Sequence, residues 1–107
     1  MRILEFNVDK QKLIKSKDCD FSGLVAGSVG YLRAKFYFTQ PEWDQCTVKV
    51  ASFWVGDKEY AVRLGKHNSC SIPDEALVGR SFRVSVIGAC TGYKIKTNKT
   101  LVRQEVN

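Results

Sequence analysis

A strict alternation of apolar and polar side chains is the feature that most constrains what this chain can fold into. It is clearest in residues 31–38, YLRAKFYF. One set of alternate residues there is apolar: Leu32, Ala34, Phe36 and Phe38. The other set is aromatic or basic: Tyr31, Arg33, Lys35 and Tyr37. Successive side chains of a strand point to opposite sides of its sheet, so this period predicts a strand with one buried face.

The same period recurs along the chain. It marks residues 48–55, 59–64 and 82–88 as strands, and the short turn at residues 56–58 predicts that the first two form a hairpin. Residues 3–8 and 99–106 are predicted as edge or terminal strands. Helix is predicted only at residues 73–78, PDEALV, as a short turn that begins near a proline and ends at a glycine.

Short strands joined by turns that carry glycine or asparagine predict an all-β fold. The expected architecture is a single antiparallel β-sandwich domain over residues 1–107, because two sheets with one apolar face each can bury those faces together. A hydrophobic share of 44% fits a folded domain of this size. A small barrel such as an OB-fold is the main alternative.

The net charge of +6 comes from 17 Lys and Arg residues against 11 Asp and Glu residues. Such a surplus is compatible with an acidic partner, but the basic residues are spread along the chain with only two mild clusters. The clusters are Lys10, Lys12, Lys15 and Lys17, and Lys94, Lys96, Lys99 and Arg103. A solvated surface accounts for both, so nucleic acid is an unlikely partner. No apolar run is long enough to span a membrane.

The four cysteines are Cys19, Cys46, Cys70 and Cys90, and no two of them form a C-x-x-C pair. Structural zinc sites bring their ligands in close pairs, so no metal site is expected. Four buried free thiols are the expected state, and one or two disulfides are possible in an extracellular assembly.

Convergent catalytic groups are not evident. His67 lies in an expected loop three residues before Cys70, but nothing nearby would activate the thiol. Asp18 and Asp20 offer too few oxygen ligands for calcium. No glycine-rich phosphate-binding or dinucleotide-binding motif is present. The sequence therefore predicts no enzyme activity, no catalytic residue and no cofactor.

Binding is the better-supported class of function. The candidate contact residues are Tyr31, Arg33, Lys35, Tyr37 and Trp54. Aromatic side chains between cations suit a protein interface, a sugar ring or single-stranded nucleic acid. The structural alternative is that aromatic residues favour strands, where cross-strand neighbours cover them.

The two tryptophans of residues 41–54, PEWDQCTVKVASFW, have different expected roles. Trp43 should close one end of the core, in a turn held by Asp44. If Ala51 and Phe53 point inward, alternation turns Trp54 outward; a shift by one residue would bury Trp54 and expose Phe53. We favour the first register.

Three segments resemble N-terminal domains of tail-fibre and baseplate proteins from phages and prophages of Gram-positive bacteria. They are YLRAKFYFTQPEWDQCT, VASFWVGDKEYAVRL and CSIPDEALVGRSFRVSVIGA, and the likeness covers about residues 31–100. It implies a β-sandwich that is often immunoglobulin-like and attaches a fibre to the baseplate, commonly in a trimer. Cys46 departs from this pattern, which tends to have an aliphatic residue there; this favours a buried free thiol.

The resemblance implies a non-enzymatic structural or adaptor domain that acts through protein–protein contacts. Its expected partners are other tail or baseplate proteins and copies of itself, with a trimer as one possible state. The expected location is the virion tail, assembled in the cytoplasm of a bacterial host. The sequence ends at Asn107 with no fibre segment after it, so a stand-alone adaptor, a head-to-tail component and a fragment are all open. A carbohydrate- or host-surface-binding module and a single-stranded nucleic-acid-binding OB-like domain are the alternatives.

Overall fold

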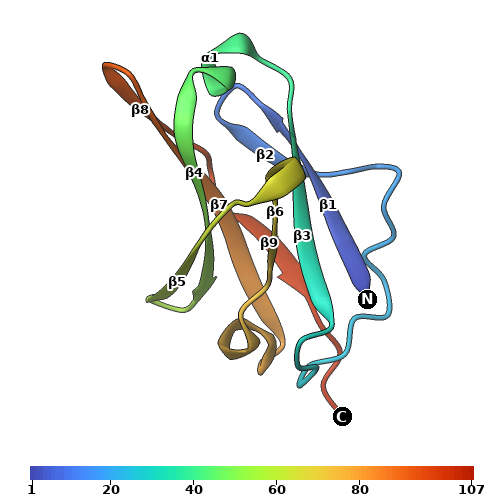
Figure 1. Ribbon diagram of the computed structural model, residues 1–107. Helices are drawn as coiled ribbons and strands as arrows, with labels where there is room; N and C mark the ends of the chain where they lie inside the picture. Colours follow the sequence, from blue (N-terminus) through green and yellow to red (C-terminus); the bar gives the residue numbers. More distant parts are fainter.

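Two β-sheets pack face to face in the computed structural model, which describes all of residues 1–107 (Figure 1). One sheet has four strands and the other has five. The predicted β-sandwich is therefore confirmed, while its immunoglobulin-like character stays a prediction.

The four-stranded sheet has the order β2-β1-β3-β6. Its strands are β1 (Arg2–Asp9), β2 (Lys12–Lys15), β3 (Leu32–Phe38) and β6 (Ser69–Ser71). The β1 strand is the first strand of the chain and lies between β2 and β3, so of the two predicted alternatives for residues 3–8 the terminal strand is confirmed and the edge strand was wrong. It also runs parallel to β3, with Phe6 opposite Phe36, so this sheet is mixed rather than purely antiparallel. Alternation identifies the buried face of a strand, but it carries no information about which neighbours the strand has.

The five-stranded sheet has the order β5-β4-β7-β8, and β9 also pairs with β7. Its strands are β4 (Cys46–Val55), β5 (Lys58–Arg63), β7 (Ser81–Cys90), β8 (Tyr93–Lys96) and β9 (Thr100–Arg103). The β4–β5 hairpin is confirmed. Its two-residue turn has Gly56 at φ +59°, a backbone angle that glycine adopts without steric cost.

Three short helical turns connect these strands. They are α1 (Pro41–Asp44), η1 (Lys66–Asn68) and η2 (Asp74–Leu77). The predicted turn at residues 73–78 is confirmed: η2 is one turn of 3₁₀ helix.

The core fills the space between the sheets. The predicted inward faces are confirmed, because their side chains are at most 3% exposed: Leu32, Ala34 and Phe36 from β3, and Phe82, Val84 and Val86 from β7. The β1 strand adds Leu4, Phe6 and Val8. The rings of Phe36 in β3 and Phe6 in β1 are stacked with their centroids 5.3 Å apart.

Trp43 closes one end of this core, as predicted. Its side chain is fully buried, its ring lies 4.9 Å from that of Phe38, and its Nε1 donates a hydrogen bond to the Lys10 carbonyl at 2.9 Å. The expectation that Asp44 holds this turn was wrong. The Trp43 amide donates a hydrogen bond to the Gln40 carbonyl at 3.1 Å instead.

Gly88 on β7 provides the space for this indole. A Cβ atom at position 88 would lie 2.9 Å from the Trp43 ring and 2.8 Å from the sulfur of Cys46. Real Cβ atoms do not approach other atoms so closely, so a glycine is required here for close packing rather than for an unusual backbone angle.

A disulfide joins Cys46 to Cys90, so the prediction of a free thiol at these two positions was wrong. The two residues lie opposite each other where β4 pairs with β7. That strand pairing brings together residues 44 positions apart, which sequence spacing alone does not reveal. The other two cysteines are free, and Cys70 is buried as predicted, whereas Cys19 is only half-buried.

Burial raises the pKa of the Cys70 thiol from its ordinary value of 9.0 to about 11. The unfolded chain therefore ionises this thiol at lower pH than the folded chain does, and stability falls as pH rises from 9.0 to about 11. We expect the free energy of unfolding to decrease by about 1–3 kcal/mol over this range on account of Cys70. Urea unfolding at each pH tests this, with Cys70→Ala expected to show a shallower decline. Parallel pH profiles for the two proteins would contradict it.

Candidate functional site

Trp54 lies on the outer face of the five-stranded sheet. Its neighbours Ala51 and Phe53 are fully buried in the core, so the favoured register of this strand is confirmed. The indole is half-buried, and its Nε1 donates a hydrogen bond to the Ser85 hydroxyl at 3.0 Å. The Lys99 ammonium lies 3.7 Å from the ring centroid, in a cation–π contact.

Three of the other predicted contact residues belong to the four-stranded sheet, where Arg33, Lys35 and Tyr37 share the outer face of β3. Each has partners within the chain. Arg33 donates to the Ser71 hydroxyl at 3.0 Å, and the Lys35 ammonium lies 5.2 Å from the Tyr37 ring. Tyr37 donates to the Glu5 carboxylate, and this hydrogen bond raises the pKa of the Tyr37 phenol.

The structure therefore does not bring the five predicted residues together. Trp54 is on one outer face of the sandwich, and Arg33, Lys35 and Tyr37 are on the opposite one. Tyr31 precedes β3 and is 49% exposed at the end of the strand. A single aromatic platform built from Trp54 and the two tyrosines is not formed.

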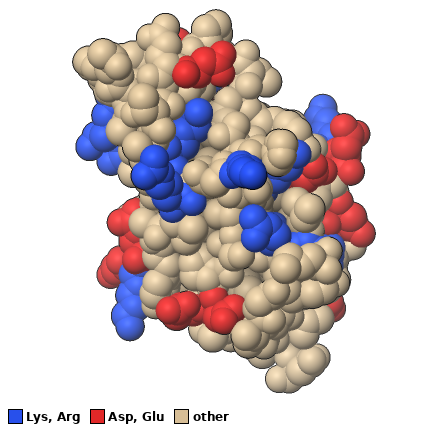
Figure 2. Space-filling view, viewed as in Figure 1, with Lys and Arg blue, Asp and Glu red and all other residues tan.

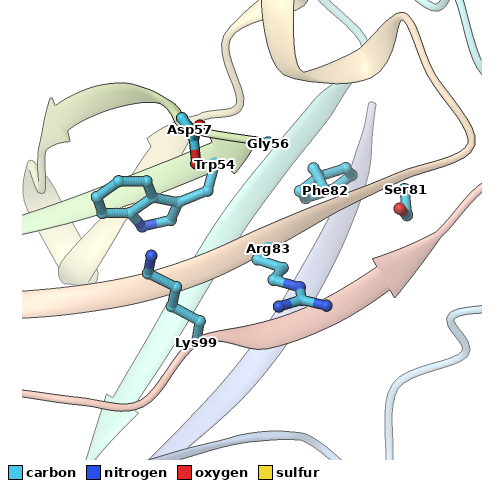
Figure 3. A pocket seen from close by; sticks show the side chains of 7 residues that line it. All are labelled: Trp54, Gly56, Asp57, Ser81, Phe82, Arg83 and Lys99. Carbon is cyan, nitrogen blue, oxygen red and sulfur yellow. The ribbon is translucent and has the colours of Figure 1, made fainter.

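A hollow of about 450 Å³ opens beside Trp54 (Figure 3). The side chains of Lys99 and Arg83 extend towards it, and the Lys99 ammonium points at the indole in Figure 3. Arg83 comes from β7, and Lys99 directly precedes β9. The pairing of β7 with both β4 and β9 places these side chains beside Trp54.

Two further hollows adjoin this one. The hollow of about 280 Å³ shares Trp54 and Lys99 with it and adds Lys96. The hollow of about 370 Å³ shares Ser81 and Arg83 with it and adds two arginines, Arg80 and Arg103. We call these three adjoining hollows together the basic groove; it is defined by Trp54, Arg80, Arg83, Lys96, Lys99 and Arg103.

The basic groove contains residues that sequence reasoning undervalued. The sequence predicts only a solvated surface for Lys96, Lys99 and Arg103, whereas the strand pairing places them with Arg83 around adjoining hollows. Elsewhere, Figure 2 shows Lys and Arg in several groups across the middle of the view, with Asp and Glu mostly towards its edges.

A second surface is apolar and lies at the end of the molecule that contains the C-terminus. Hydrogen bonds tie three segments together there: the Ala26 amide donates to the Glu105 carbonyl at 2.8 Å, and the Gly27 amide donates to the Leu77 carbonyl at 2.7 Å. These segments and the nearby N-terminus expose Met1, Val25, Val29, Tyr31, Val78 and Val106, which we call the apolar end. The lower end of Figure 2, where the C-terminus lies in Figure 1, is largely free of charged side chains.

The residues considered for catalysis or metal binding do not converge. His67 is exposed in η1, while the Cys70 thiol is buried and its pKa is raised. Hydrogen bonds from Ser22 lower the pKa of Asp20. No group of three His, Cys, Asp or Glu residues has a geometry that could hold a metal ion.

Comparison of this chain with protein-family models, with curated proteins and with solved structures found no match. None of its helices has the length and apolar character needed to cross a membrane.

Proposed function

We propose that this protein is a non-enzymatic structural or adaptor domain of a phage or prophage tail or baseplate, where it acts through protein–protein contacts. The resemblance of its three segments to tail-fibre and baseplate domains supports this class of assembly, and with it a location in the virion tail. The observation that carries the proposal is the apolar end.

The apolar end is suited to protein association. Val29 and Val78 are 74% and 67% exposed, although each has the chemistry of a core residue. Exposed apolar side chains that gather at one end of a molecule often mark a protein interface. The segments that display it are connected by backbone hydrogen bonds, so a partner meets a largely pre-formed surface. The occupant we propose is a second copy of this chain in a homo-oligomer, for which a trimer is one candidate state.

A carbohydrate-binding module is less well supported. Stacking on a sugar would use Trp54 together with the tyrosines, but these side chains lie on opposite outer faces or at the end of the sandwich.

The oligomeric state tests the proposal. Light scattering coupled to size exclusion, from micromolar to millimolar protein, is expected to show a mass that rises with concentration to that of a small oligomer. Val29→Asp combined with Val78→Asp is expected to give a monomer with unchanged thermal stability, because both side chains are exposed.

Ile14→Asp is the matched control, since Ile14 is an exposed apolar residue of β2 outside the apolar end. It is expected to oligomerise as the unmodified protein does. A protein that stays monomeric throughout the concentration range would overturn the proposal, as would an oligomer that the double variant leaves intact.

A further inference from the structure

We infer that the basic groove is a binding site for single-stranded nucleic acid. None of its defining residues belongs to the apolar end, so this inference does not depend on the proposed protein contact.

The charge of the groove selects an anionic ligand. Five exposed cations line it, three of which are arginines: Arg80, Arg83 and Arg103, with Lys96 and Lys99. The only acidic residues that line it are Asp57 and Glu59, and the Glu59 carboxylate already accepts a hydrogen bond from Ser52. Arginine guanidinium groups bind phosphate oxygens in pairs of parallel hydrogen bonds. Five cations around adjoining hollows fit a ligand that carries several phosphates, as a nucleic-acid strand does.

Trp54 distinguishes a nucleic acid from other linear anions. It lines two of the three hollows, so an aromatic ring lies among the cations. The bond from its Nε1 to Ser85 fixes the orientation of the indole. Stacking of bases on such rings, with cations on the phosphates, is the general mode of single-strand binding. An acidic peptide would use the cations but would have no comparable need for the ring.

The contact between Lys99 and Trp54 suggests how the ligand is received. In the free protein the Lys99 ammonium lies on the indole and Arg83 lines the same hollow. A base that stacks on the indole takes the place of the ammonium, which becomes free to meet the adjoining phosphate. Binding therefore replaces the contact between Lys99 and the indole with a contact between Lys99 and a phosphate.

Titration of a labelled oligothymidylate into the full chain, followed by anisotropy, tests the inference. Binding at low salt is expected, with a slope of log affinity against log salt of up to about −3.5 for five phosphate contacts. Trp54 emission is expected to be quenched, while Trp43, which is fully buried, contributes a constant background. Trp54→Ala is expected to weaken binding by about 5- to 100-fold.

Charge reversal provides matched variants. Arg83→Glu combined with Lys99→Glu is expected to abolish binding of the oligonucleotide. Lys17→Glu combined with Lys66→Glu changes the net charge by the same amount outside the groove, and this variant is expected to retain most of the binding. Both pairs replace exposed side chains, and thermal melting verifies that each variant is folded.

Three results would overturn the inference. The first is no anisotropy change even at low salt. The second is equal weakening by the two charge-reversed pairs, which would indicate diffuse attraction. The third is binding of inorganic polyphosphate or an oligoglutamate peptide as tight as that of the oligonucleotide, with no loss in Trp54→Ala; this would indicate a site for anions or acidic proteins in general.

Discussion

Replacement of Trp43 by alanine is expected to lower the free energy of unfolding by about 3–5 kcal/mol, because it removes a large and fully buried side chain. The loss has three sources. The cavity left at the end of the core would not close fully, the contact with the Phe38 ring would be lost, and the Lys10 carbonyl would lose the hydrogen bond from Nε1. Since small domains are stable by about 5–15 kcal/mol, a large part of the total would be removed.

Urea unfolding followed by circular dichroism measures this loss, and Trp54→Ala is the matched control. Trp54 is the same residue type but is half-buried on an outer face. Removal of the Trp54 side chain is expected to lower the free energy of unfolding by about 1–2 kcal/mol, because it removes less buried apolar area and one cation–π contact. Equal losses for the two variants would show that Trp43 does not close the core.

Loss of the Cys46–Cys90 disulfide is expected to lower the free energy of unfolding by about 2–4 kcal/mol. The bond closes a long loop, because its two cysteines are 44 positions apart, and so restricts the unfolded chain. Cys46→Ala combined with Cys90→Ala is expected to unfold at lower urea concentration than the oxidised protein. Reduction of the unmodified protein is expected to have a similar effect.

A count of reactive thiols is the most direct test of the Cys46–Cys90 disulfide. The oxidised protein, unfolded without reductant, is expected to react at two thiols, Cys19 and Cys70, and after reduction at four. Cys19→Ala serves as the control, because it removes a cysteine without removing the bond. A count of four before reduction would contradict the disulfide, and so would a double variant whose stability still depends on reductant.

The faces of the strands could be predicted because they follow from local alternation. Phe36 and Phe53 are buried for the reason the sequence pattern suggests, namely that every second side chain of a strand meets the facing sheet. The β4–β5 hairpin could be predicted because its turn and both strands are adjacent in sequence.

Strand partners could not be predicted, because they depend on pairing between distant segments. The parallel alignment of β1 with β3 and the approach of Cys46 to Cys90 both depend on such pairing. The basic groove depends on two strand pairings at once, since Lys99 reaches Trp54 only across β7. In the sequence the cations of the groove are interspersed with polar and apolar residues, and they therefore resemble ordinary surface charge.

The close approach of Gly88 to Trp43 and Cys46 has a consequence for how this fold can vary through evolution. An indole at position 43 and any side chain at position 88 exclude each other while α1 and β7 keep their spacing. Substitutions at these positions are therefore expected to be correlated among homologous chains: where position 88 gains a side chain, positions 43 and 46 should both have smaller residues. Such paired changes would identify distant relatives even after the surface residues and the cysteines have diverged.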